Sequence, residues 1–187
     1  MRHEFTGKRP ALTLVLFILP LLLTSQAAFG ASAKEIDTKV DASLETFMEK
    51  VVEGEAFLNQ AEGVLVFPSV IKAGFGIGGE YGEGALRIGG KTVDYYSTAA
   101  ASIGFQLGAQ AKTIILVFLD KKALKGFRDS QGWEAGVDGS VALVTVGAGG
   151  AIDTSNIQDP IVAFVFNNKG LMYNLTLEGS KFTKIHP

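Results

Sequence analysis

Residues 61–91 read AEGVLVFPSVIKAGFGIGGEYGEGALRIGGK, and this stretch decides the fold. An apolar run ends at Pro68, and a segment follows in which glycine alternates with Phe75 and Ile77. A two-residue period is that of a β-strand, whose successive side chains point to opposite faces. Glycine destabilises a strand, so a strand this rich in glycine marks tight curvature, a bulge or a close backbone neighbour. We therefore predict a strongly curved sheet.

Apolar runs alternate with glycine-rich turns through the rest of the body, residues 61–187. TIILVFL (113–119) is short and continuously apolar, which predicts a strand buried on both faces. IVAFVF (161–166) and LMYNLTL (171–177) flank NNKG (167–170), a strong hairpin signal. The content of 23 Gly against 5 Pro fits β structure with tight turns. These patterns predict an α+β, β-rich fold with a curved, mostly antiparallel sheet or a barrel-like core.

Residues 1–33 have the three-part pattern of a secretory signal peptide. A basic start is followed by the apolar run LTLVLFILPLLL (12–23), and small residues then lead to the A-x-A pattern Ala31-Ser32-Ala33. The apolar run is shorter than the roughly 20 residues that span a bilayer, and it contains Pro20, so we predict cleavage rather than a membrane anchor. Cleavage after Ala33 or after Gly30 would leave a periplasmic or otherwise exported protein, which we expect to be a single domain (34–187).

The exported chain is mildly acidic and offers little catalytic chemistry. Removing the three basic residues and the one acidic residue of 1–33 leaves 14 basic and 18 acidic residues, a net charge of −4. That balance gives no electrostatic case for nucleic acid. There is no Cys, and the two His stand at positions 3 and 186, so nucleophile systems that need a thiol or a His base lack a plausible member. We predict no enzymatic activity, no metal and no cofactor.

Two glycine-rich matches to nucleotide-binding motifs fail on their context. Gly74–Gly79 satisfies G-x-G-x-x-G, but the segment that follows is broken by glycine and acidic, where a helix would have to begin. Gly90-Lys91-Thr92 resembles the end of a P-loop, but Ala85 stands where the motif requires its first glycine. Four carboxylates of the body are interpreted as solvated turn residues, with a hydrolase built on carboxylates as a third alternative; they are Glu80, Glu83, Asp94 and Asp138.

Residues 34–60 carry apolar side chains at helical spacing. The stripe consists of Ile36, Val40, Leu44, Phe47, Met48, Val51 and Val52. Gly54 is expected to break the helix, and a short second helix follows. The opposite face is mostly acidic (Glu35, Asp37, Asp41, Glu45 and Glu49), whereas a helix that lies on an anionic membrane is usually rich in Lys and Arg there. We therefore predict that these N-terminal helices pack on the outside of the domain core.

A second helical segment, KKALKGFR, follows Asp120, which we predict to be its N-cap. At helical spacing Ala123, Leu124 and Phe127 share one side, and the four basic residues Lys121, Lys122, Lys125 and Arg128 fall on the other. Lys121 and Lys122 would lie in the first turn, where the helix dipole disfavours positive charge by a few tenths of a kcal/mol. Because helix stability does not explain them, the basic residues are candidates for a small anion-facing patch; the alternative is an ordinary solvated face.

The chain resembles the SYLF domain family over roughly residues 55–185. Four stretches carry the resemblance: AEGVLVFPSVIKAGFGIGGEYGEGAL, SIGFQLGAQAKTIILVFLDKKALKGF, WEAGVDGSVALVTVGAG and FNNKGLMYNLTLEGSKFTKI. Their order and spacing match as well, and the bacterial branch of the family fits best. The resemblance implies a compact β-rich domain with peripheral helices that binds lipid. Eukaryotic members bind phosphoinositides and, in some cases, actin filaments.

The resemblance adds two candidate lipid-binding residues, Lys72 and Phe75, because the family pattern has basic and apolar residues at these positions. Eukaryotic members place a basic amphipathic segment before the domain, whereas this chain has a leader and an acidic helix, so we do not expect actin or phosphoinositides as ligands. The predicted function is a non-enzymatic domain of the bacterial envelope that binds anionic phospholipid or a membrane surface through a local basic face. The alternative is a structural or protein-interaction module of the periplasm without a small ligand. The sequence specifies no oligomeric state.

Overall fold

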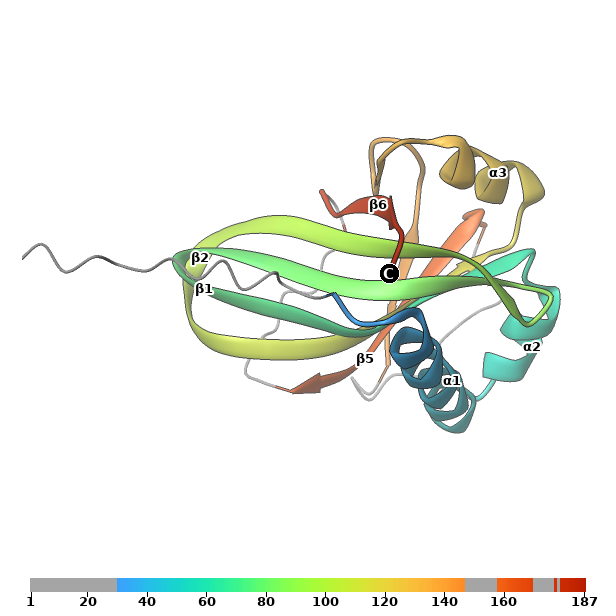
Figure 1. Cartoon of the computed structure of the whole chain (residues 1–187), viewed down its shortest axis with the longest axis horizontal. Helices are drawn as coiled ribbons and strands as arrows, with labels where there is room; N and C mark the ends of the chain where they lie inside the picture. The colour runs from blue at the N-terminus through green and yellow to red at the C-terminus, as the bar shows by residue number, and fades with distance from the viewer. Residues whose placement is uncertain (1–29, 147–157, 170–176, 178) are drawn as a thin grey trace, which may run out of the picture.

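Two long antiparallel strands, β1 (Gly63–Ile88) and β2 (Lys91–Phe118), form the centre of the molecule (Figure 1). The computed structural model describes residues 30–146, 158–169, 177 and 179–187, with the backbone alone at 75–77, 102–109 and 168–169. The other described elements are α1 (Ala33–Lys50), α2 (Gly54–Gln60), α3 (Lys121–Asp129), β3 (Trp133–Glu134), β4 (Ala142–Thr145), β5 (Ile161–Lys169) and β6 (Lys181–Ile185). Most of the predicted signal peptide, residues 1–29, lies outside the described residues.

The described strands form one curled sheet in the order β3-β6-β2-β5-β4, with β1 paired to β2. All pairs are antiparallel except β4 with β5. One edge of β2 is shared between two strands, because residues 95–99 pair with β6 and residues 111–118 pair with β5. Figure 1 shows both long strands bending back at the end of the molecule that lies away from α2. This half-barrel-like sheet with three helices confirms the predicted α+β fold class.

The curl brings the second half of β1 against its own first half. A Cβ atom added at Gly84 would lie 2.1 Å from the carbonyl oxygen of Val66, and one added at Gly82 would lie 2.9 Å from that of Ser69. Real Cβ atoms do not approach other atoms so closely, so both positions require glycine for lack of space. The ladder between β1 and β2 also shifts register between Gly74 and Gly76, as at a β-bulge. The glycine-rich pattern of this strand therefore reflects all three causes that the sequence suggested: curvature, a bulge and a close backbone neighbour.

A buried ion pair lies across the curl. The Nζ of Lys112 lies 2.9 Å and 3.2 Å from the two carboxylate oxygens of Glu80, and these side chains are 8% and 6% exposed. In the ladder between the long strands, Glu80 stands opposite Ala100 and Lys112 opposite Val70, so the two residues meet only because both strands bend back. The interpretation of Glu80 as a solvated turn residue is therefore wrong, because the curl buries this stretch of strand.

The last part of β2 is buried on both faces, as predicted. Ile114 and Leu116 belong to a core cluster that includes Phe127 of α3 and Phe182 of β6. Ile115 and Val117 belong to a second cluster that lies beneath α1 and α2. All the residues from Ile114 to Phe118 have no exposed surface. A strand covered on both faces has no polar side to present, which explains its continuous apolar run.

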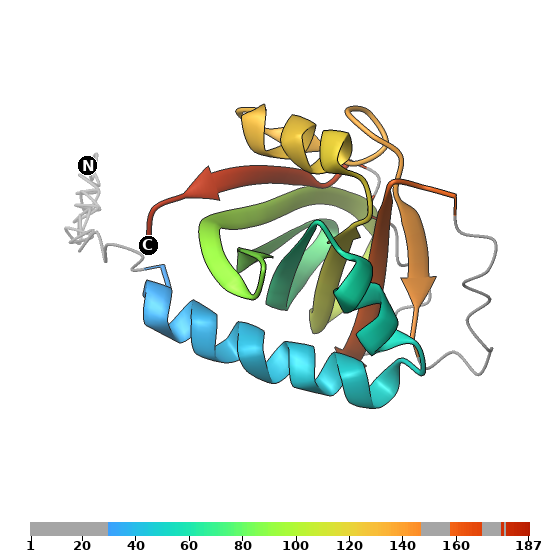
Figure 2. The ribbon, with the colours of Figure 1, turned by 90° about the vertical axis from the view of Figure 1, so that its right-hand side faces the viewer.

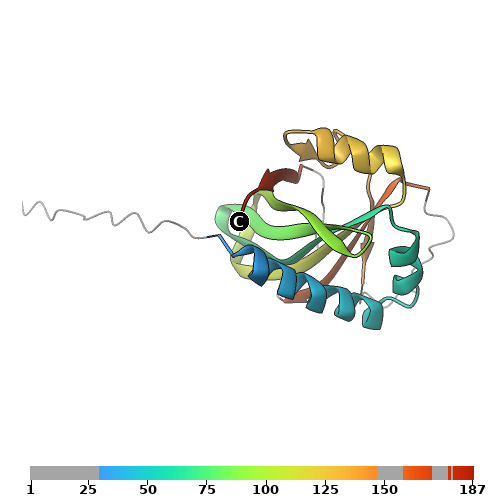
Figure 3. The same cartoon turned by 45° about the vertical axis from the view of Figure 1, so that its right-hand side comes forward.

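The N-terminal helices pack on the outside of the sheet, as predicted. The rings of Phe47 in α1 and Phe57 in α2 both meet the ring of Phe164 in β5 edge-on, at centroid distances of 4.9 Å and 5.0 Å. The predicted break near Gly54 falls at residues 51–53, and Gly54 begins α2. Figure 2 and Figure 3 show α1 and α3 on opposite sides of the curled sheet. Among the described helices, none is both long and apolar enough to cross a membrane.

Part of the acidic face of α1 contacts the long strands rather than solvent. Asp37 accepts hydrogen bonds from the hydroxyl groups of Thr92 (2.7 Å) and Tyr95 (3.0 Å). The guanidinium of Arg87 lies 2.8 Å from a carboxylate oxygen of Asp41. Burial raises the pKa of Tyr95, and its hydrogen bond to Asp37 raises it further, so the phenol remains a donor. Polar bonds at the start of α1 therefore supplement its apolar stripe.

The sequence predicted a hairpin turn at residues 167–170. This prediction is wrong for residues 167–169, because they belong to β5. Thr113 pairs with Phe166 and Ala111 with Lys169, so β5 carries one extra residue there, as in a β-bulge. Asn167 has φ 56°, a left-handed conformation that asparagine tolerates. Its side-chain oxygen accepts a hydrogen bond from Lys50 of α1 at 2.6 Å. The signal typical of a turn therefore produces a bulge, and the predicted second arm (171–177) lies outside the described residues except at its end.

Replacing Gly84 by Ala should destabilise the protein strongly, because the new Cβ would overlap the carbonyl oxygen of Val66. Overpacking ordinarily costs about 1–3 kcal/mol, and a clash with backbone belongs at or above the upper end of that range. Urea unfolding followed by circular dichroism measures the loss. The control is Gly126→Ala in α3, where a Cβ would meet no atom within 4 Å. This substitution should stabilise the helix by up to about 1 kcal/mol. Unchanged stability of the Gly84 variant would contradict the close approach.

Replacing Glu80 by Ala should lower the free energy of unfolding by about 3–5 kcal/mol, because Lys112 is then left buried without a counter-charge. The double variant Glu80→Leu/Lys112→Met should recover most of this loss, since an apolar pair of similar volume needs no solvation. Urea unfolding of the two variants and the parent gives the comparison. A single variant as stable as the parent would show that Lys112 has another partner or reaches water.

Candidate functional site

The helix α3 is held in place by its cap and its buried face. Asp120 accepts hydrogen bonds from the backbone N–H groups of Lys122 (2.8 Å) and Ala123 (2.9 Å), which confirms it as the N-cap. Leu124 and Phe127 are buried, as the helical spacing predicted. The ring of Phe127 contacts the rings of Tyr96, Phe118, Trp133 and Phe182, with centroids 4.9–6.1 Å apart. The basic side chains of the helix are thereby turned outward.

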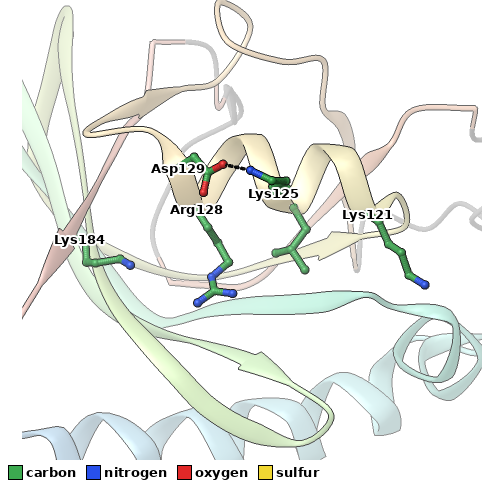
Figure 4. Close-up of a pocket in the computed structure, with 6 residues that line it drawn as sticks. Lys121, Lys125, Arg128, Asp129 and Lys184 are labelled. Atoms are coloured by element: carbon green, nitrogen blue, oxygen red, sulfur yellow. Dashed lines mark hydrogen bonds and ion pairs between the residues drawn. The ribbon is translucent and has the colours of Figure 1, made fainter.

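A pocket of about 350 Å³ lies between this helix and β6. It is lined by Lys121, Leu124, Lys125, Arg128, Asp129 and Lys184. Figure 4 shows three basic side chains spaced along α3 and the side chain of Lys184 extending toward Arg128. Lys184 was not among the predicted site residues, because only the pairing of Lys184 with Tyr96 between β6 and β2 brings it to this helix. No local pattern in the sequence signals that pairing.

Two of the four cations in the pocket are bound to one carboxylate. Asp94 of β2 lies 3.0 Å from the guanidinium of Arg128 and 2.8 Å from the ammonium of Lys184, and its side chain is 15% exposed. Asp94 is therefore not the solvated turn residue that the sequence suggested. Its ion pairs connect α3, β2 and β6, which gives Arg128 and Lys184 a structural role in shaping the pocket.

The other two cations are exposed and loosely held. The side chains of Lys121 and Lys125 are 80% and 77% exposed. Lys125 pairs with Asp129 one turn further along α3, and Lys121 lies 3.8 Å from Glu62. Four cations thus face three carboxylates, and the pocket carries an excess of about one positive charge. Leu124 adds an apolar surface beside the two lysines, so the site suits an anion attached to an apolar group.

Tyr96 lies beneath the pocket and stays neutral. Burial raises the pKa of its phenol to about 12, with Asp94 adding to the rise and Arg128 opposing it. The ammonium of Lys184 lies 5.8 Å from the centroid of the ring, which is within the range of a cation–π contact. This tyrosine therefore supports Lys184 through its ring rather than through a charge.

Lys122 does not belong to this pocket. It lines a second pocket, of about 560 Å³, on another side of α3 with Trp133, Asp138 and Ser140 among its neighbours. Asp138 accepts a hydrogen bond from the backbone of Glu134 at 2.7 Å, so this carboxylate holds a turn. The structure thus separates Lys122 from the three basic residues with which the sequence grouped it.

The two candidates taken from the family resemblance lie on β1, away from the pocket. Lys72 is half-buried and stands opposite Gln110 of β2. Gly63, at the start of β1, packs against Leu124 of α3. Lys72 lies nine residues further along β1, which is about 30 Å of extended strand. Phe75 belongs to β1, but its side chain lies outside the described part of the structure. The fold therefore does not bring Lys72 alongside the basic residues of α3.

The described residues hold no group of three or more His, Asp or Glu side chains placed to bind a metal. Glu83 accepts hydrogen bonds from the hydroxyl of Tyr81 (2.8 Å) and from the backbone N–H of Ala31 (2.9 Å). Glu80, Asp94 and Asp138 also accept hydrogen bonds or ion pairs, as described above. Each of the four carboxylates considered for catalysis therefore has a partner that stabilises the fold. Among the concave surfaces described here, the α3–β6 pocket is the most basic.

Comparison with known proteins agrees with the family resemblance. A family model described as Ysc84, Las17-binding protein actin regulator, matches residues 99–186, from within β2 to the end of β6. No curated protein matches the chain. The matched segment contains α3 and every residue that lines the α3–β6 pocket. Residues 99–186 thus match the Ysc84 family model, in agreement with the resemblance to the SYLF domain family found in the sequence.

Proposed function

We propose that the protein is a non-enzymatic module of the bacterial envelope that binds the anionic headgroups of a membrane surface through the α3–β6 pocket. The Ysc84 family is associated with actin and lipid binding and is generally a family of binding modules rather than of enzymes. Export of the chain, predicted from residues 1–33, would place it where phospholipid is available and actin is not.

The observation that carries the proposal is the position of Lys121 and Lys125. The first turn of α3 contains no acidic residue, and Lys121 lies there against the unfavourable end of the helix dipole. Both lysines project into one concave surface beside Leu124. The position of Lys121 is unfavourable for the helix and that of Lys125 stabilises it only slightly, whereas both positions are favourable for an anion that approaches the pocket.

The expected attraction is weak and depends on salt. The chain from residue 34 onward has a net charge of −4, so a membrane must be recognised locally. A basic residue near an anionic surface contributes about 1 kcal/mol, and this attraction fades over about 10 Å at 0.1 M salt. Two exposed lysines would therefore strengthen binding about 30-fold, which suits a reversible contact with a surface.

Replacing both Lys121 and Lys125 by Gln should reduce retention on vesicles that contain an anionic phospholipid by about 30-fold at low salt. Cosedimentation with anionic and with purely zwitterionic vesicles, each at low and high salt, measures the change. Thermal stability should stay almost constant, because exposed ion pairs of this kind contribute only about 0–1 kcal/mol.

The matched control is Lys34→Gln/Lys39→Gln on α1, which removes the same charge and breaks the exposed pair between Lys39 and Glu35. The control should bind like the parent. Equal losses in the two double variants would mean that overall charge, not the pocket, attracts the protein. If the parent is not retained on anionic vesicles, the proposal fails in favour of a protein-interaction module.

A further inference from the structure

The carboxylate of Glu83 lies against the point where the predicted leader joins the folded domain. It accepts a hydrogen bond from the backbone N–H of Ala31 at 2.9 Å and another from the hydroxyl of Tyr81 at 2.8 Å. A Cβ atom added at Gly30 would lie 2.8 Å from a carboxylate oxygen of Glu83. The peptide bond between Gly30 and Ala31 is therefore in direct contact with this side chain.

No Lys or Arg of the described residues forms an ion pair with Glu83. Lys39 and Glu83 line one surface pocket together with Gly30 and Ala31, but the ammonium of Lys39 lies 2.6 Å from Glu35. The half-buried carboxylate is thus left with two neutral donors. A positive charge at the nitrogen of Ala31 would be the missing partner, and it would need no change in the position of that atom.

Hydrolysis of the Gly30–Ala31 peptide bond creates this charge. Water supplies the oxygen that completes a carboxylate on Gly30, which departs with the leader, and the nitrogen of Ala31 becomes an α-ammonium. The neutral N–H bond to Glu83 then becomes a charge-assisted one, which is roughly twice as strong. Ala28 and Gly30 are both small, as the positions three and one before a leader cleavage site require.

Cleavage after Ala33, the other site that the sequence allows, would damage the start of α1. Ser32 is the N-cap: its side chain accepts from the backbone N–H of Glu35, and its carbonyl accepts from Ile36 at 2.9 Å. A chain that begins at Lys34 loses both bonds and places a second positive charge at the positive end of the helix dipole. Ile36, only 2% exposed, needs this turn in place to be buried.

We propose that the leader is removed between Gly30 and Ala31, and that the new α-ammonium of Ala31 forms an ion pair with Glu83 that fixes the start of α1 to β1. This site rests on the export that the proposed function assumes, but not on lipid binding. The two ideas therefore fail separately, since the position of the N-terminus does not depend on what α3 binds.

The first test is the intact mass and N-terminal sequence of the protein recovered from the envelope of a bacterium that expresses the whole chain. We expect a single product that begins at Ala31. A product that begins at Lys34, or one that retains the leader, overturns the proposal.

The second test asks whether the new N-terminus forms the ion pair. All core residues of the described structure lie after Ala31, so the processed chain contains the complete core. Acetylating its α-amino group should lower the unfolding temperature by about 2–4 °C, the shift typical of losing one charged bond in a protein of this size. Glu83→Gln should do the same, and the acetylated Glu83→Gln protein should be no less stable than either alone.

The control for this test is a chain that begins at Lys34, in which Glu83→Gln should have a clearly smaller effect because the ammonium is absent. If acetylation leaves the unfolding temperature of the Ala31 chain unchanged, or if the effects of acetylation and Glu83→Gln add in full, no ion pair exists and the proposal is overturned.

Discussion

The second half of β1 crosses its own first half so closely that Gly84 has no room for a Cβ, which would lie 2.1 Å from the carbonyl oxygen of Val66. That contact fixes where the strand bends back. The bend is passed to β2, because the two strands stay paired from Gly63 opposite Phe118 to Ile88 opposite Lys91. Each half of β2 then has its own neighbour, because residues 95–99 pair with β6 and residues 111–118 pair with β5. The ion pair of Glu80 with Lys112 can exist only when both strands are bent, so it stabilises the curled form.

The basic pocket depends on the same curl. The first half of β2 supplies Tyr96 and Asp94, and β6 is placed beside it so that Lys184 stands opposite Tyr96. The second half of β2 ends at Phe118, where the chain enters α3, and Phe127 of that helix packs against both Phe118 and Tyr96. Without the curl, the start and the end of β2 would not both pack against α3. The pocket is therefore a consequence of the sheet's shape, although none of its lining residues lies on the glycine-rich segment.

The sequence predicted those features that depend on neighbours along the chain. Glycine alternating with Phe75 and Ile77 indicated curvature, the run at 113–119 indicated a strand buried on both faces, and Asp120 indicated the start of α3. It failed where a distant partner decides the outcome. Glu80 looked solvated because nothing near it in the chain shows that Lys112 will meet it. Lys184 lies about 60 residues after α3, and it joins the pocket through strand pairing that no local pattern encodes.

The charges of the molecule differ in how freely they can exchange partners. Arg128 shares Asp94 with Lys184, and because Asp94 is 15% exposed, withdrawing either cation would leave a poorly solvated carboxylate. Lys121 and Lys125 are in the opposite situation, since their ion pairs are solvent-exposed and such pairs contribute only about 0–1 kcal/mol. An anion that enters the pocket can therefore replace Glu62 or Asp129 as their partner at little cost, while the ion pairs of Asp94 keep the walls in place. In the proposed binding, shape and affinity would thus come from different residues of one basic cluster, so that the pocket could bind and release an anion without changing its structure.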